Sequence, residues 1–131
     1  MKKTDVVIIG AGPCGLFQVF ELGLLGLKSE VIDSIRNPGG QCTELYPDKP
    51  IYDIPAIPMC TGQELTDSLL KQIEPFDYGM TLNDEVISID RQGENDFIIE
   101  TISNKKFQCQ AVVIAGGVGS FQPRQLRVEN A

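Results

Sequence analysis

Three glycines, Gly10, Gly12 and Gly15, follow an apolar run at the spacing G-x-G-x-x-G. In a strand–turn–helix unit the first permits a sharp turn, the second leaves room for a pyrophosphate, and the third lets the helix pack close to the sheet. Pro13 suits the first helical position, where its missing N–H costs no hydrogen bond, and Cys14 follows it. The helix would direct unpaired N–H groups and its positive dipole end at a phosphate. The turn therefore predicts binding of a nucleotide diphosphate.

Asp33 stands eighteen residues after the last of these glycines, at the end of a second apolar run. A carboxylate at this position can accept hydrogen bonds from ribose hydroxyls and repels a 2′-phosphate. The pattern predicts FAD or NAD as the ligand and disfavours NADP. The alternative is a turn whose glycines serve packing alone, with an incidental aspartate.

A second pair of glycines, Gly39 and Gly40, precedes Gln41 on a proline-rich stretch. Paired glycines allow the backbone to approach a flat ring system, and the amide of Gln41 can both donate and accept. The stretch could follow a bound cofactor toward its far end. It could equally be a tight turn that begins at Pro38.

The composition narrows the chemistry further. The 131 residues contain no histidine, the side chain that most often moves protons near neutral pH. A net charge of −7 with scattered lysines and arginines disfavours nucleic-acid binding, and the uncharged stretch 6–20 is too short to span a bilayer. The four cysteines form no C-x-x-C pair and are interpreted as reduced, mostly buried thiols of a cytoplasmic protein. Chemistry must therefore come from a cofactor, a carboxylate or a thiol.

The elements around the glycine turn predict a βαβ unit. The run 4–9 is β-branched and does not alternate with polar residues, as in a strand buried on both faces of a parallel sheet. Apolar residues then recur at helical spacing until Gly26, which is expected to close the helix. Residues 30–34 read as the next strand, joined by a right-handed crossover.

The rest of the chain is predicted to continue an α/β domain. Five prolines make 35–58 an irregular loop of the kind that is usually functional. A capping box at Thr61 predicts a helix that ends before Pro75. Strands are expected at 85–90, 96–102 and 107–115, the first two joined by a turn.

Five segments together resemble one known family. They are DVVIIGAGPCGLF (5–17), VIDS (31–34), PGGQ (38–41), LYPDKPIYDIP (45–55) and AVVIAGGVGSFQPR (111–124). They resemble the ferredoxin–NADP reductases of the thioredoxin-reductase-like type, and the match extends over nearly the whole chain. The resemblance implies a three-layer, Rossmann-like FAD-binding domain, with a parallel sheet and a small antiparallel meander, that is incomplete at its C-terminus.

The resemblance also implies roles for single residues. The glycine turn would bind the FAD pyrophosphate, Asp33 the adenosine ribose, and the backbone of Val86 the adenine. Alternatively, Val86 is a core residue, and the aromatic residues Tyr46 and Phe121 pack without contacting a ligand. No catalytic side chain and no metal ligand is assigned. The implied cofactor-binding residues are Gly10, Gly12, Pro13, Cys14, Gly15, Asp33, Ser34, Gly40, Gln41, Tyr46, Val86, Gly116 and Phe121.

Family members are much longer and carry a separate NADPH-binding domain and a closing FAD segment. We therefore expect residues 1–131 to be the N-terminal part of the FAD-binding domain of a homodimeric enzyme that passes electrons between NADPH and ferredoxin or a similar carrier. By itself this part should be inactive and should retain FAD weakly. Cys42 has no second cysteine at position 47, so no catalytic disulfide is expected there. The alternatives are the FAD-binding part of a thioredoxin reductase and a non-catalytic nucleotide-binding module.

Overall fold

A four-stranded parallel sheet forms the centre of the molecule. The computed structural model describes residues 1–117, except for the side chains of Gln41 and Cys42. The strand order is β10-β2-β3-β6, with bounds Ala111–Ile114, Val6–Ile9, Ser29–Ile32 and Tyr78–Thr81. All three neighbouring pairs are parallel. The β-branched run of β2 lies in the middle of this sheet and is covered on both faces, as its lack of alternation predicts.

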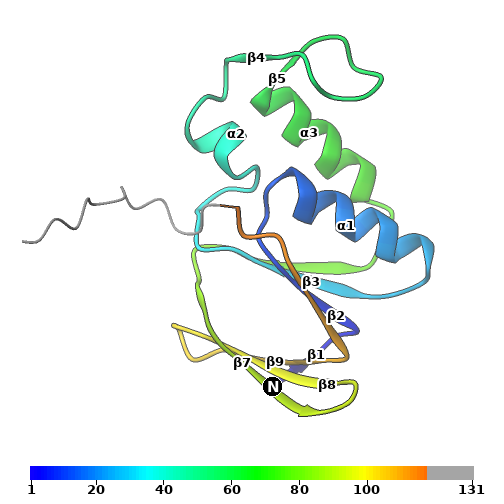
Figure 1. The fold of residues 1–131 in the computed structure, drawn as a ribbon, viewed down its shortest axis with the longest axis vertical. Coiled ribbons are helices and arrows are strands. Elements are labelled where there is room, and N and C mark those ends of the chain that lie inside the picture. The colour runs from blue at the N-terminus through cyan, green and yellow to red at the C-terminus, as the bar shows by residue number, and fades with distance from the viewer. Residues whose placement is uncertain (118–131) are drawn as a thin grey trace, which may run out of the picture.

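Two helices cover one face of the parallel sheet. These are α1 (Pro13–Leu24) and α3 (Gly62–Ile73), which Figure 1 shows side by side. The predicted capping box is present at the start of α3: the Thr61 hydroxyl accepts from Glu64 N–H, and the Glu64 carboxylate accepts from Thr61 N–H. Val31, Leu16 and Leu69 are among the buried side chains packed between the helices and the sheet.

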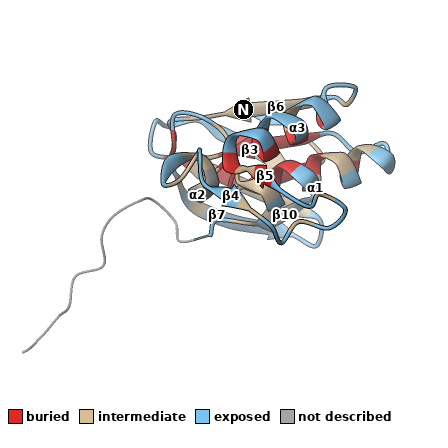
Figure 2. Ribbon diagram, turned by 90° about the horizontal axis from the view of Figure 1, so that it is seen from above, coloured by how far each residue is buried: buried red, intermediate tan, exposed pale blue. Residues whose placement is uncertain are grey.

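A second sheet covers the opposite face and completes three layers (Figure 1). Its strand order is β1-β9-β8-β7, with bounds Lys2–Lys3, Lys106–Cys109, Asp96–Thr101 and Val86–Gly93. Val7 and Ile32 of the parallel sheet pack against Ile99 and Phe107 of this sheet, and all four are almost inaccessible to solvent. In Figure 2 the buried residues gather on the central strands and the inner sides of the helices. The α/β class and the layered architecture predicted from the sequence are confirmed.

The single strand predicted over 107–115 is wrong, because the structure divides it at Gln110. Residues before this break join β9 of the second sheet, and residues after it form β10 of the parallel sheet. The N–H of Gln110 donates to the carbonyl of Asp5, which lies between β1 and β2, so both chain segments pass from one sheet to the other at this point. Two further strands of these two sheets, β1 and β6, were not predicted. β1 has only two residues, and β6 carries a glycine within four residues, so neither has a continuous apolar run.

The proline-rich stretch is irregular for most of its length, as predicted. It contains a four-residue helix, α2 (Gln41–Glu44), and a short antiparallel pair, β4 (Pro50–Ile51) with β5 (Cys60–Thr61). Among the cysteine side chains that the structure describes, Cys60 and Cys109 are buried, whereas Cys14 is exposed. No helix within residues 1–117 combines the length and apolar character needed to cross a membrane.

Candidate functional site

The three glycines of the motif differ in whether the surrounding backbone leaves room for a Cβ atom. Gly10 has a φ of 116°, and a Cβ on it would overlap the carbonyl oxygen of Ala115. A Cβ on Gly15 would overlap the carbonyl oxygen of Gly10, so only glycine lets α1 pack this close to β2. A Cβ on Gly12 would meet only the Cα of Gly40, at an ordinary distance of 3.8 Å. The protein's own packing therefore requires Gly10 and Gly15, while the space beside Gly12 is open to a ligand.

The amino end of α1 carries free hydrogen-bond donors beside this space. Its N-cap is Gly12, which has no side chain to cap the first turn, and Pro13 follows at the position where no N–H is needed. Apart from the side chains of Gln41 and Cys42, which the structure does not describe, no group within residues 1–117 accepts a hydrogen bond from the backbone N–H of Cys14 or Gly15. Two donors and the positive end of the helix dipole thus face outward, an arrangement that suits an anion.

The carboxylate of Asp33 points toward the glycine turn. Its Oδ2 accepts a hydrogen bond of 2.7 Å from the N–H of Ala11, and its Oδ1 accepts one of 3.2 Å from the N–H of Ile35. Each carboxylate oxygen keeps a lone pair free for a further donor. Asp33 is therefore fixed in orientation and can still accept from a ligand hydroxyl.

A cavity of about 160 Å³ opens at the carboxyl ends of the parallel strands, next to Asp33. We call it the strand-end cavity. It brings together five of the residues predicted from the sequence with several that were not predicted. No Lys or Arg in the described part of the chain lines it, so it suits a neutral group that donates hydrogen bonds and disfavours a phosphate. Its lining residues are Ile9, Gly10, Ile32, Asp33, Ser34, Asp84, Glu85, Val86 and Gly116.

Val86 packs against the core and also lines the strand-end cavity, and its contact with an adenine stays a prediction. Its side chain is half-buried and packs against the core between the two sheets. The residue also lines the strand-end cavity, at the start of β7. Gly116 lines the same cavity from the turn after β10, while Phe121 lies outside the described residues.

The paired glycines lie directly against the glycine turn. The N–H of Gly39 donates to the carbonyl of Ala11 at 2.8 Å, and Gly40, with a φ of 60°, faces Gly12. The Thr43 hydroxyl lies within hydrogen-bonding distance of the Pro38 and Gly40 carbonyls and steadies the loop from the other side. Position 41 begins α2 immediately afterwards. The loop is thus a turn in conformation, and it also brings an open backbone to the candidate phosphate position.

A second, larger cavity of about 550 Å³ lies on the other side of the glycine turn. We call it the Tyr46 cavity. Tyr46 is half-buried, and the Lys49 ammonium lies 5.5 Å from the centre of its ring, in cation–π geometry. The cavity is lined mainly by apolar and aromatic side chains, as expected for the site of a flat, largely apolar group. Its lining residues are Pro13, Tyr46, Lys49, Pro50, Ile51, Tyr52, Asp53, Ile54 and Leu65.

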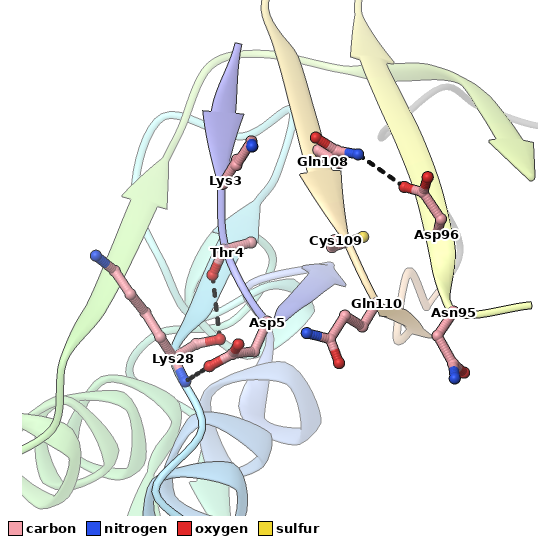
Figure 3. A pocket seen from close by; sticks show the side chains of 9 residues that line it. All are labelled: Lys3, Thr4, Asp5, Lys28, Asn95, Asp96, Gln108, Cys109 and Gln110. Carbon is pink, nitrogen blue, oxygen red and sulfur yellow. Dashed lines mark hydrogen bonds between the residues drawn. The ribbon is translucent and has the colours of Figure 1, made fainter. Parts of the chain in front are cut away.

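A polar cavity of about 510 Å³ lies at the opposite end of the sheet (Figure 3). It is formed near the amino ends of β2 and β3, whereas ligands of open α/β sheets bind at the carboxyl ends. Several of its polar groups already bond to one another: Asp5 accepts from the N–H of Lys28, and Gln108 donates to Asp96 (Figure 3). We do not assign a function to this cavity.

The sequence did not indicate Asp84 and Glu85, which supply two of the three carboxylates of the strand-end cavity. They precede a strand in sequence, and no motif marks them. Their position just before β7 is the one signal that could have indicated them. The fold brings this position beside Asp33, where the N–H of Asp84 donates to the Asp33 carbonyl at 3.1 Å.

The chain is similar in sequence to curated reductases. The ferredoxin–NADP reductase of Polaromonas sp. (strain JS666) is 62% identical over 127 residues, which are 97% of this chain and 35% of that protein. Ferredoxin–NADP reductase 2 of Cupriavidus necator is 60% identical over 128 residues, 98% of this chain and 35% of that protein. The chain thus spans about a third of the length of these curated relatives.

Solved structures resemble the fold. Thioredoxin reductase from Streptococcus pyogenes superposes with a TM-score of 0.78 at 24% identity, covering 96% of this chain and 38% of that one. Bacillithiol disulfide reductase from Staphylococcus aureus gives a TM-score of 0.72 at 20% identity, covering 88% and 38%. A family model described as pyridine nucleotide-disulphide oxidoreductase matches residues 4–131. With that match over almost its whole length, the chain belongs to the pyridine nucleotide-disulphide oxidoreductase family.

Proposed function

We propose that this chain binds FAD across the glycine turn. The observation that carries the proposal is the arrangement of two cavities on either side of one anion-binding helix end: Gly10 lines the strand-end cavity, and Pro13 lines the Tyr46 cavity. A dinucleotide has the matching order of parts, with a neutral nucleoside, a central diphosphate and a second flat ring. Residues 1–131 would then be the N-terminal part of an FAD-binding domain.

Each part of FAD fits the chemistry at its proposed position. The diphosphate would lie beside Gly12, where there is open space and where no described group accepts from the N–H groups of Cys14 and Gly15. The ribose would donate hydroxyls to Asp33 and the adenine would lie against Val86. The flavin would extend past Gly40 and Gln41 toward Tyr46. The described residues at the adenosine end supply three carboxylates and no cation, which disfavours a 2′-phosphate and so favours FAD over NADP at this site.

We further propose that the whole enzyme is a ferredoxin–NADP reductase. The support is the sequence identity of about 60% to proteins of that name. Bound FAD accepts a hydride and releases single electrons, which is the chemistry such a reaction requires. The role left to the residues of this chain is to bind and orient the cofactor, which needs no histidine, and the sequence contains none. NADPH, ferredoxin and a cytoplasmic location belong to the same proposal.

We also propose that the enzyme is a homodimer. Phe17, Leu24, Leu25 and Leu27 are exposed along and just after α1, and apolar surface of this kind is typical of contacts between chains. Light scattering after size exclusion measures the mass directly. A strictly monomeric mass at high micromolar concentration would contradict the homodimer.

Competition for the site tests the cofactor proposal. Flavin fluorescence should be quenched as the chain is titrated into FAD, and ADP should reverse the quenching because it occupies the strand-end cavity and the phosphate position. ADP carrying a 2′-phosphate should compete much more weakly, since Asp33 repels it. Equal competition by both nucleotides, or none by ADP, would contradict the proposal.

The electron-transfer proposal requires the complete enzyme for its test. A ferredoxin–NADP reductase should reduce ferredoxin with NADPH and should not reduce thioredoxin, which separates it from the thioredoxin reductases whose fold it shares. These 131 residues contain one G-x-G-x-x-G motif, so we expect them to show no NADPH diaphorase activity by themselves. Robust turnover by this chain would contradict that expectation.

A further inference from the structure

Asp84 is a buried carboxylate to which the proposed function gives no role beyond its negative charge. It is 4% exposed and lies in the connection between β6 and β7. Its Oδ2 accepts a 2.6 Å hydrogen bond from the Ser103 hydroxyl, and its Oδ1 accepts from the N–H groups of Glu85 at 3.0 Å and Ser103 at 3.3 Å. The side chain thereby joins the β6–β7 connection to the turn between β8 and β9.

The backbone around Asp84 is tied to the opposite wall of the strand-end cavity. The N–H of Asp84 donates to the carbonyl of Asp33 at 3.1 Å. One residue earlier, the N–H of Asn83 donates to the carbonyl of Ile35 at 2.8 Å. The carbonyl of Glu85 accepts from Ile102 at 2.8 Å, which is a second tie to the β8–β9 turn. Asp84 therefore lies between Asp33, the residue proposed to bind the ribose, and the segment that contains Val86.

We propose that Asp84 is a positioning residue for the nucleoside end of the cofactor: by binding Ser103 and Glu85 it fixes the wall formed by Glu85 and Val86 at the distance from Asp33 that an adenosine needs. This inference rests on the proposed binding of FAD. It adds a residue that does not need to touch the ligand and acts through the backbone of its neighbours.

The electrostatics of the carboxylate agree with this role. Burial alone raises the pKa of Asp84, but the hydrogen bonds from Ser103 and Glu85 outweigh burial and hold the pKa below its ordinary value. The side chain is consequently ionised at neutral pH, and its hydrogen bonds are charge-assisted and stronger than neutral ones.

A purely structural role would lower stability without a specific loss of affinity, so a matched control is needed. Asp5 provides it, because its Oδ2 also accepts a backbone hydrogen bond, of 2.7 Å from Lys28, at the far end of the sheet. The variants Asp84→Ala, Asp84→Asn, Ser103→Ala and Asp5→Ala are compared for thermal stability and for ADP affinity. Affinity is measured well below the unfolding transition, by NMR shift titration of the full chain with ADP.

We expect Asp84→Ala to weaken ADP binding about tenfold, because the ordered wall is then present in only a fraction of molecules. Asp84→Asn keeps the Oδ1 acceptor, so it should restore most of the affinity, and Ser103→Ala should lose about fivefold because one net hydrogen bond is worth about 1 kcal/mol. Asp5→Ala should lose stability and keep wild-type affinity. FMN, which lacks the adenosine, should bind all four variants equally.

Wild-type ADP affinity in Asp84→Ala, or an affinity loss in Asp5→Ala of the same size, would overturn the inference. Should Asp84→Ala fail to fold, Ser103→Ala takes its place, because it removes one donor and leaves the carboxylate. Wild-type ADP affinity in Ser103→Ala would then overturn the inference. Failure of the wild-type chain to bind ADP at all is a different result, which overturns the proposed cofactor site together with this inference.

Discussion

Replacing Gly15 or Gly12 by alanine should affect two different properties, the stability of the fold in one variant and ligand binding in the other. In Gly15→Ala, the new Cβ overlaps the backbone carbonyl of Gly10, and backbone cannot move aside as the end of a flexible side chain can. In Gly12→Ala, the new Cβ touches only the Cα of Gly40 at 3.8 Å, and the backbone at Gly12, with φ −75° and ψ −177°, suits alanine. Gly15→Ala should therefore damage the fold, and Gly12→Ala should damage binding.

The magnitudes follow from these contacts. Alanine in place of a helical glycine gains up to about 1 kcal/mol from helix propensity, whereas overpacking costs about 1–3 kcal/mol and more against rigid backbone. The net effect of Gly15→Ala should be a loss of about 2 kcal/mol, or a melting temperature lower by roughly 8 °C for a chain of this size. Gly12→Ala alters an N-cap and should cost about 1 kcal/mol at most, yet its methyl group occupies the proposed phosphate position.

Urea unfolding and ADP titration on both variants distinguish the two effects. We expect Gly12→Ala to unfold near the wild-type midpoint and to bind ADP at least about tenfold more weakly, the equivalent of about 1.4 kcal/mol. Gly15→Ala should unfold at clearly lower urea concentration. A Gly15→Ala variant as stable as wild type would refute the packing argument, and wild-type ADP affinity in Gly12→Ala would refute the position of the diphosphate.

Three further predictions concern stability and thiol reactivity. The Glu30 carboxylate is 2% exposed and lies 3.0 Å from Lys2 Nζ, so Lys2→Met leaves this buried carboxylate without its cation. We expect the free energy of unfolding in urea to fall by about 1–2 kcal/mol, and Lys2→Arg should restore it. Because the pKa of Asp84 lies below its unfolded value of about 3.9, its stabilisation is present above that pH and is lost as pH falls through the folded pKa; acid titration of Asp84→Asn should show a shallower loss. Mass-resolved alkylation should modify exposed Cys14 quickly and Cys109 only on unfolding, since burial raises the pKa of the Cys109 thiol; equal rates would contradict the burial.

The sequence predicted the elements that carry strong local signals. The run before Gly10, the βαβ unit and the capping box at Thr61 are all present, because each depends on residues that are neighbours in sequence. The two strands missed in the large sheets depend on distant partners: β1 is stabilised by pairing with β9 and β6 by pairing with β3, and neither has a periodic pattern of its own. The break at Gln110 was missed for the same reason, since apolar residues continue on both sides of it.

The candidate site divides in the same way. Gly10 and Asp33 could be found from spacing, because the motif encodes a local turn and one crossover. Asp84 and Glu85 could not, because only the pairing of β6 with β3 and the hairpin of β7 with β8 bring them to the same cavity as Asp33. Even with Asp33 known, the spacing of 51 residues between it and Asp84 carries no periodic signal.

The two sides of the proposed cofactor site meet at a single residue. Ala11 is fully buried; its N–H donates to the Asp33 carboxylate at 2.7 Å, and its carbonyl accepts from Gly39 at 2.8 Å. The Asp33 carboxylate and the loop that faces Gly12 are therefore held by the two backbone groups of one buried residue. Burial excludes water from these groups, so neither hydrogen bond can be exchanged for one to solvent without cost. Ala11 thus fixes the carboxylate proposed to bind the ribose relative to the loop beside the proposed diphosphate position.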